Sequence, residues 1–279
     1  MKKYRSIWIS DLHLGTNGCK ADELCKFLKN NDCEHLYLVG DIVDGWKLNR
    51  SWNWPQSHSN VIRRLLTSAK RGTNITYIIG NHDEFLRDWV RFGIQVGNIR
   101  VVNECDHVGV TGQRYLVVHG DMFDSVTRNY KWVSMLGDMA YELLLRINSV
   151  LNKTRKWFGY NYWSFSRYIK LNAKQAANFI FKFELHLIKH ALNEGYDGIF
   201  CGHIHFPEIK MMGDLVYMNS GDFVESISAL IEVHTGEIIL VHLYENKWCP
   251  LKILDIHSGH ILEGDDCAKW CEANNFNMI

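Results

Sequence analysis

Residues 6–13 read SIWISDLH, a short apolar run that stops at Asp11 and His13. The run is continuous rather than alternating, which is typical of a strand buried on both faces of a sheet. Similar runs, each ending in polar residues, follow in LYLVGD (36–41), ITYIIGNHD (75–83), YLVVHGD (115–121) and GIFCGHIH (198–205). The carboxyl ends of such strands are where α/β sheets hold their ligands. The pattern therefore predicts a sheet with a polar site along one edge.

Segments of helical character separate the first three runs, over residues 21–30 and 60–71. Strand and helix alternate at steps of roughly thirty residues, which predicts βαβ units. Residues 216–218, 229–233 and 238–243 are expected to close the fold as further strands. We therefore expect one α/β domain over residues 1–279.

The interval between the fourth and fifth runs has a different pattern. Apolar residues follow helical spacing over 132–151 and again over 173–192. This predicts a helical insertion, a lid over residues 126–192, within the α/β domain.

Composition narrows the class of protein. The chain has 279 residues, 47% of them hydrophobic and 22% charged, with a formal net charge of zero. This is ordinary globular composition, with no overall field to attract nucleic acid. The eight cysteines show no C-x-x-C spacing, the N-terminus lacks a signal-peptide pattern, and no apolar stretch could span a bilayer. We expect a cytoplasmic protein with reduced cysteines.

The side chains at the strand ends form a mixed set of oxygen and nitrogen donors. Two carboxylates, four imidazoles and one amide suit Mn²⁺, Fe²⁺ or Zn²⁺, and there are too many for a single tetrahedral ion. The H-x-H pair is expected to be extended, so that both imidazoles point the same way toward adjacent ions. A single D-x-H or H-x-H would be weak evidence, but five such fragments together are specific. The predicted ligands are Asp11, His13, Asp41, Asn81, His119, His203 and His205.

The fragments DLH (11–13), GDIVD (40–44), GNHD (80–83), HGD (119–121) and GHIH (202–205) resemble the signature of calcineurin-like metallophosphoesterases. The resemblance implies a four-layer α/β/β/α sandwich with two divalent ions. It assigns Asp11, His13, Asp41 and His205 to one ion, and Asp41, Asn81, His119 and His203 to the other, with Asp41 as the bridge.

The same resemblance implies roles in catalysis and substrate binding. His82 would face the phosphoryl group, to stabilise charge or to protonate the leaving oxygen, with Asp83 fixing its tautomer. Asn81 and His203 would lie beside the substrate as well as the ions. Asp44 is either a carboxylate that supports this group or a simple turn or cap residue.

A closer resemblance is carried by GDIVDGWKLNRSWNWPQSH (40–58), GNHDEF (80–85) and YMNSGDFVES (217–226). These stretches are similar to those of bacterial UDP-2,3-diacylglucosamine diphosphatases. That family acts in lipid A synthesis at the inner face of the inner membrane, cleaving a pyrophosphate to give UMP and 2,3-diacylglucosamine 1-phosphate. Its best-known branch has arginine where this chain has His82 and Phe206. Mn²⁺ is the expected ion, with Fe²⁺ or Zn²⁺ as alternatives.

The predicted insertion supports a lipid-like substrate independently. Residues 126–182 carry ten Lys and Arg against two acidic residues, and WFGYNYWSFSRY (157–168) holds seven aromatics. Basic and aromatic residues together indicate a surface for an anionic headgroup and acyl chains, or aromatics that simply pack the insertion on the domain. Arg128, Lys170 and Lys174 are expected to point toward the phosphates.

Two other functions compete with this interpretation. One is a metal-dependent phosphodiesterase acting on another nucleotide or on nucleic acid, for which a basic aromatic groove would also serve. The other is a catalytically inert, membrane-peripheral binding module, which the complete set of seven ligands disfavours. The sequence leaves open the oligomeric state and the role of residues 244–279.

Overall fold

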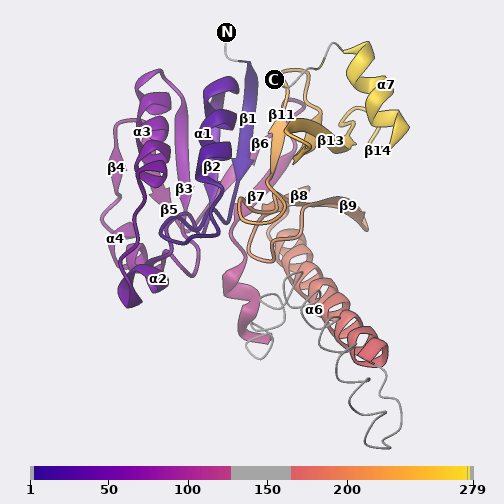
Figure 1. Cartoon of the computed structure of the whole chain (residues 1–279). Helices are drawn as coiled ribbons and strands as arrows, with labels where there is room; N and C mark the ends of the chain where they lie inside the picture. Colours follow the sequence, from indigo (N-terminus) through magenta and orange to yellow (C-terminus); the bar gives the residue numbers. More distant parts are fainter. Residues whose placement is uncertain (1–2, 127–164, 275, 277–279) are drawn as a thin grey trace, which may run out of the picture. The chain divides into compact units, whose positions relative to one another are not determined.

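A computed structural model describes residues 3–126, 165–274 and 276, without the side chains of 124–126 and 165–176. The chain divides into two compact units, residues 1–121 with 188–279, and residues 122–187. The larger unit contains both sheets (Figure 1). In the smaller unit lie most of the 3-10 helix η2 (Asp121–Val126) and most of α6 (Phe165–Asn193).

The first sheet has nine strands, and its centre is parallel. Strands β1, β2, β3 and β5 run parallel to one another, and β11, β12, β13 and β14 continue the sheet antiparallel on one side. The order along the sheet is β14 (Ile261–Glu263), β13 (Lys247–Leu254), β12 (Ile238–Tyr244), β11 (Ser228–Glu232), β1 (Tyr4–Ile9), β2 (Cys33–Val39), β3 (Asn74–Ile78), β5 (Ile99–Val102) and β4 (Gln95–Val96).

The second sheet has five strands. Its parallel centre consists of β7, β8 and β10, flanked by antiparallel partners. The order is β6 (Glu104–Val108), β7 (Arg114–Val118), β8 (Gly198–Cys201), β10 (Leu215–Asn219) and β9 (Glu208–Met212).

The two sheets pack face to face around Trp8. This side chain is fully buried, and its ring stacks on Phe200 of the second sheet at 3.9 Å and on Tyr37 of its own sheet at 5.2 Å between centroids. A buried indole between two rings provides a large apolar contact, and its truncation to alanine would cost about 3–5 kcal/mol.

Helices cover the other face of the nine-stranded sheet. α1 (Ala21–Asn30) and α3 (Gln56–Lys70) lie beside each other there, and α7 (Asp265–Ala273) packs on β13 and β14. The fit of α1 follows from its sequence, since Leu24, Phe27 and Leu28 recur at helical spacing and are all buried. The short elements α2 (Gly45–Arg50), η1 (Glu84–Leu86) and α4 (Arg87–Val90) follow the ends of β2 and β3.

The mixed α/β fold predicted from the sequence is confirmed, with two open sheets. All eight predicted strands occur, and the helix predicted over 173–192 lies within α6, which begins earlier, at Phe165. The helix predicted over 132–151 lies outside the described residues. The chain after Tyr244, whose role the sequence left open, forms β13, β14 and α7 and extends the nine-stranded sheet.

Candidate metal centre

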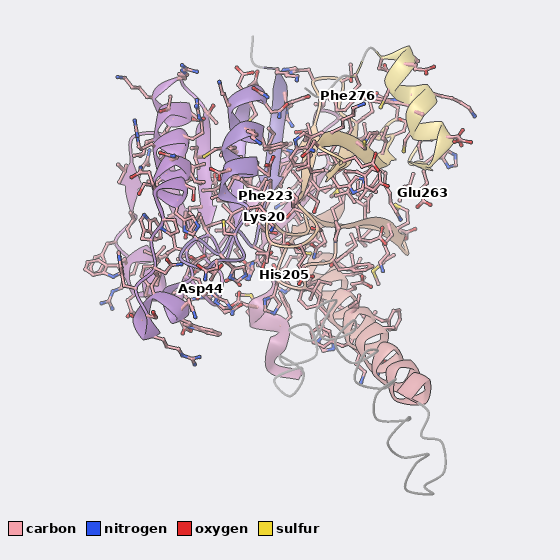
Figure 2. All side chains as sticks on the ribbon, viewed as in Figure 1. Lys20, Asp44, His205, Phe223, Glu263 and Phe276 are labelled. Atoms are coloured by element: carbon pink, nitrogen blue, oxygen red, sulfur yellow. The ribbon has the colours of Figure 1, made fainter. Side chains whose placement is uncertain are left out.

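The loops after β1, β2, β3, β7 and β8 bring the predicted ligands to one edge of the larger unit, where Asp44 and His205 are labelled in Figure 2. Backbone hydrogen bonds tie the first two loops together, from Asp11 N to Gly40 O (3.0 Å) and from His13 N to Asp41 O (2.9 Å). Among the described residues, three groups of side chains have donor atoms close enough to hold a metal ion. They are Asp11, His13 and His205; Asp41, His119 and His203; and His13, Asp44 and His82.

The backbone at these positions is unusual. Five of the seven predicted ligands have positive φ angles, between 49° and 71°, a region that non-glycine residues rarely occupy. Such conformations cost about 1–3 kcal/mol each and cluster at functional sites, where the surrounding fold enforces them. The five residues are Asp11, His13, Asp41, His203 and His205.

The extended geometry predicted for the H-x-H pair is wrong. β8 ends at Cys201, and His203 and His205 both adopt left-handed conformations beyond it. The rings consequently serve different groups. His203 lies 5.0 Å from His119 and His205 lies 5.3 Å from His13, both measured between ring centroids.

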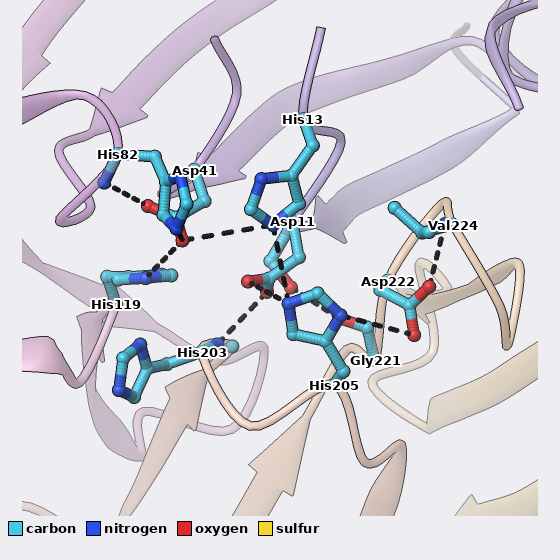
Figure 3. A network of polar contacts seen from close by, with 12 residues as sticks. Asp11, His13, Asp41, His82, His119, His203, His205, Gly221, Asp222 and Val224 are labelled. Carbon is cyan, nitrogen blue, oxygen red and sulfur yellow. Dashed lines mark hydrogen bonds and ion pairs between the residues drawn. The ribbon is translucent and has the colours of Figure 1, made fainter. Parts of the chain in front are cut away.

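Asp41 lies between the groups, as Figure 3 shows. Its Oδ2 is 3.4 Å from Nε2 of His119 and 3.9 Å from Nε2 of His13, while its Oδ1 accepts a hydrogen bond from the backbone N–H of His82 at 2.8 Å. Asp11 lies beside it, with Oδ1 3.1 Å from Nε2 of His205, a residue of its own group. The Asp41 carboxylate thus faces His119 of its own group and His13 of the group that contains Asp11 and His205. Two metal ions that share one ligand require this arrangement.

Unsatisfied polar atoms provide an independent test of whether metal ions fit. Asn81 Oδ1 is buried and has no hydrogen-bond partner among the described residues, while the buried Asp11 Oδ1 and His119 Nε2 make no hydrogen bond there and have only the ion-pair contacts given above. Burying such atoms costs about 1–3 kcal/mol each unless something coordinates them. His119 also has its Nδ1 2.9 Å from the carbonyl oxygen of Val39, a contact that leaves Nε2 as the ligating nitrogen. The residues present therefore fit divalent cations.

Mutual electrostatics decide the charge of these groups when no metal balances them. Burial opposes ionisation of Asp11, but His205 and His119 outweigh it and lower the pKa of Asp11 to about 2. Burial likewise opposes protonation of the imidazoles, but Asp41 raises the pKa of His119 to about 10, and Asp11 raises that of His205 to about 9. Cation binding must therefore displace protons from this cluster.

The carboxylate beside His82 is Asp44, not Asp83 as predicted. Asp44 Oδ1 lies 3.0 Å from Nδ1 of His82, and its Oδ2 lies 3.3 Å from Nδ1 of His13. Its Oδ1 also accepts from Lys47 N at 2.8 Å, so Asp44 both caps α2 and supports the two imidazoles.

Asp83 has a different function in the structure. Its carboxylate accepts hydrogen bonds from the backbone N–H groups of Ile42 (2.9 Å) and Val43 (2.7 Å) and from the Tyr77 hydroxyl (2.8 Å). It thereby holds the loop that carries Asp41. Burial and the charge of Asp41 raise the pKa of Asp83 to about 6, in spite of these three donors.

Two residues near the site were not predicted. Asp222 is fully buried, with its Oδ2 3.9 Å from Nδ1 of His205, and it also accepts from Val224 N at 2.7 Å (Figure 3). Asp222 belongs to an SGD stretch (220–222) that follows β10 and repeats the pattern of polar residues at a strand end. This pattern could have identified Asp222 as a site residue from the sequence. Trp46 lies with its ring 4.3 Å from that of His82, and its Nε1 donates to Glu84 at 2.8 Å.

The predicted phosphate contacts of the insertion remain predictions. Arg128 lies outside the described residues, and Lys170 and Lys174 lie on α6 with side chains outside them. Asn81, His82 and His203 lie at the edge of the larger unit described above, in the loops after β3 and β8.

Comparison with solved structures finds distant similarity over most of the chain. A phosphoesterase from E. coli, Yfce, is 12% identical with a TM-score of 0.47, covering 90% of this chain and 98% of its own. Vps29 from Entamoeba histolytica, complexed with zinc, is 10% identical with a TM-score of 0.45, covering 92% and 98%. An archaeal phosphodiesterase is 13% identical with a TM-score of 0.37, covering 93% and 98%. No curated protein matches the sequence.

A family match covers residues 4–207, which include every predicted metal ligand and more than half of the chain. The members of this family are hydrolases that depend on two metal ions, and the grouped carboxylates and imidazoles fit that chemistry. On this match the chain belongs to the calcineurin-like phosphoesterase family, as a metal-dependent hydrolase.

Proposed function

We propose that this hydrolase cleaves the pyrophosphate of UDP-2,3-diacylglucosamine, giving UMP and 2,3-diacylglucosamine 1-phosphate, with two Mn²⁺ ions. The observation that carries the hydrolytic part is the position of Asp41, whose carboxylate faces ligands of both metal groups next to His82. When bound, two divalent ions supply positive charge to the phosphoryl oxygens and lower the pKa of the attacking water.

The chain's own residues would position the ions and the proton. Asp11, His13, Asp41 and His205 would hold one ion, and Asp41, Asn81, His119 and His203 the other. The His82 side chain is 23% exposed, so a substrate can reach it, and Asp44 Oδ1 lies 3.0 Å from its Nδ1. Attack by water on one phosphorus forms a new phosphorus–oxygen bond, breaks the bond from that phosphorus to the bridging oxygen, and releases a proton from the water. Protonated His82 gives the leaving oxygen its proton, which is the usual role of a positioned imidazole, and the proton released by the water restores it.

The lipid part of the proposal is supported by the sequence of the insertion. Its ten basic residues within 126–182 suit a pyrophosphate and an anionic surface, and its aromatics suit acyl chains. No helix within the described residues has the length and apolarity that a membrane span requires. We place the enzyme at the cytoplasmic face of the inner membrane, bound at the surface, with a nucleotide-linked lipid as its ligand and without nucleic acid.

The test is a comparison of substrates on purified, Mn²⁺-loaded protein, with Fe²⁺ and Zn²⁺ as alternative ions. We expect hydrolysis of bis-p-nitrophenyl phosphate and a much higher kcat/KM on UDP-diacylglucosamine than on UDP-glucosamine, because each buried CH₂ contributes about 0.8 kcal/mol. Equal values on the two UDP-sugars would refute the lipid substrate and leave a nucleotide phosphodiesterase. Inactivity on all three with both ions bound would indicate an inert binding module.

A further inference from the structure

Exposed aromatic residues gather on the chain just beyond His82. Phe85, Trp89 and Phe92 are between 50% and 67% exposed, within eight residues of sequence, and Val96 beyond them is 66% exposed. Trp52, which follows α2, is 77% exposed, and it and Trp89 are the exposed tryptophans of the described residues. Isolated apolar residues on a surface need no explanation, but a concentration of aromatics marks a contact site.

These aromatics belong to one surface with basic residues, formed by residues 45–52 and 84–92. We call it the aromatic–basic surface. It carries four Lys and Arg against two acidic residues. Lys47, Arg50 and Arg91 are exposed, and none of them forms an ion pair with a described residue. The Arg91 guanidinium lies 4.9 Å from the centroid of the Phe92 ring, and that ring lies 6.2 Å from Trp89.

Direct contacts join the two halves of this surface to each other and to the metal centre. Gly45 N donates to the carbonyl oxygen of His82 at 3.1 Å, and Trp46 Nε1 donates to Glu84 at 2.8 Å. In Figure 1, α2 and α4 lie close together below the ends of β2 and β3. A partner bound to this surface would therefore be held beside the entrance to the catalytic edge.

We propose that the aromatic–basic surface docks the enzyme on an anionic phospholipid bilayer. Tryptophan and phenylalanine enter the boundary between headgroups and acyl chains, while Lys and Arg remain with the lipid phosphates. The cores of protein interfaces are, in contrast, depleted in charged residues, whereas here they alternate with the aromatics. The choice of a bilayer rests on the lipid substrate proposed above, because such a substrate must reach the metal centre from the membrane.

The experiment measures co-sedimentation of the full chain with vesicles of phosphatidylcholine, with and without phosphatidylglycerol. We expect binding to the anionic vesicles that weakens as salt is added, and about tenfold weaker partitioning for Trp89→Ala/Phe92→Ala. Arg91→Glu should weaken binding to anionic vesicles specifically. The matched control is Val108→Ala/Val110→Ala, which shortens two apolar side chains that are 51% and 42% exposed on another part of the surface. All variants should hydrolyse bis-p-nitrophenyl phosphate like the wild type.

Several outcomes would overturn the proposal. The double variant could bind vesicles as the wild type does, or the wild type could bind neutral vesicles equally well at any salt concentration. The wild type could also ignore vesicles but self-associate in sedimentation velocity in a way that the double variant abolishes, which would make the surface a protein contact. If the vesicle results are as expected but UDP-diacylglucosamine is not hydrolysed, the docking surface stands and the proposed substrate fails.

Discussion

Replacement of Gly80 by alanine tests the geometry of the metal centre without removing any ligand. Gly80 lies between β3 and Asn81, with an ordinary φ, and a Cβ atom there would lie 2.2 Å from Oδ1 of Asp41 and 2.9 Å from Nε2 of His119. Both neighbours are buried, and Asp41 is also held by the backbone N–H of His82. The Cβ would also lie 2.4 Å from the backbone nitrogen of Asp41, so the new methyl group cannot fit unless Asp41 moves together with its backbone.

The expected size of the effect follows from these distances. Restoring ordinary van der Waals contact displaces Asp41 by about 1 Å, whereas metal ligands tolerate about 0.2 Å. A displacement of about 1 Å at a reacting centre costs on the order of 10²-fold in rate, and the overpacking itself costs about 1–3 kcal/mol of stability. We therefore expect Gly80→Ala to fold, with a lowered Tm, to lose metal on dialysis, and to lose at least that factor in kcat.

The assay combines metal analysis after dialysis, the Tm, and turnover of bis-p-nitrophenyl phosphate. Gly109→Ala is the matched control, because this glycine also has an ordinary φ and a Cβ there meets Tyr115 at 3.1 Å, away from the predicted ligands. If Gly80→Ala keeps both ions and turns over like Gly109→Ala, then Asp41 does not occupy the position that we assign to it.

The remaining predictions concern the shared carboxylate, the proton donor and pH. Asp41→Asn should lose metal and activity together, whereas His82→Ala should keep metal but lose about 10²–10⁴ in kcat; a metal-free His82→Ala protein would make His82 a ligand. Asp44→Asn should keep metal, lower kcat more than it raises KM, and shift the pH–rate profile, which an unchanged profile would contradict. The fold raises the pKa of His119 from 6.5 to about 10 and that of His205 from 6.5 to about 9. In the metal-free protein, their contribution to the free energy of unfolding is therefore complete below pH 6.5 and is lost as the pH rises through 9 and 10. Metal binding should correspondingly tighten with rising pH and release protons, which calorimetry in buffers of different ionisation enthalpy would detect.

The strands and the identity of the ligands could be predicted because each rests on a local pattern. A continuous apolar run such as that of β1 is typical of a strand that is buried on both faces. The sequence alone therefore shows both the length of the strand and the polar residues at which it ends. Parallel strands of one sheet place their carboxyl ends at one edge, and this predicts that Asp11 and Asp41, which follow β1 and β2, lie together. His119 follows β7 of the other sheet, so its place beside them depends on how the two sheets pack. The strands after Tyr244 carry a weaker pattern, because β13 is only half-buried along most of its length.

The partners of each ligand could not be predicted, because they depend on backbone angles that sequence patterns do not encode. The spacing of two residues predicted an extended pair for His203 and His205. Both residues instead have positive φ angles, and their rings belong to separate groups of metal ligands. For the same reason, the sequence predicted the wrong carboxylate as the partner of His82. Asp83 is adjacent in sequence, yet its side chain turns to the N–H groups of the loop after β2, while Asp44, distant in sequence, reaches the imidazole from the N-cap of α2. Adjacency along the chain is therefore a poor guide to the partner of a catalytic histidine. The loops that leave the strands set those partners. Hydrogen bonds between loops hold them in place, both within one sheet, from Ile42 N and Val43 N to Asp83, and between the two sheets, from His203 N to Asp11 Oδ2 at 3.0 Å.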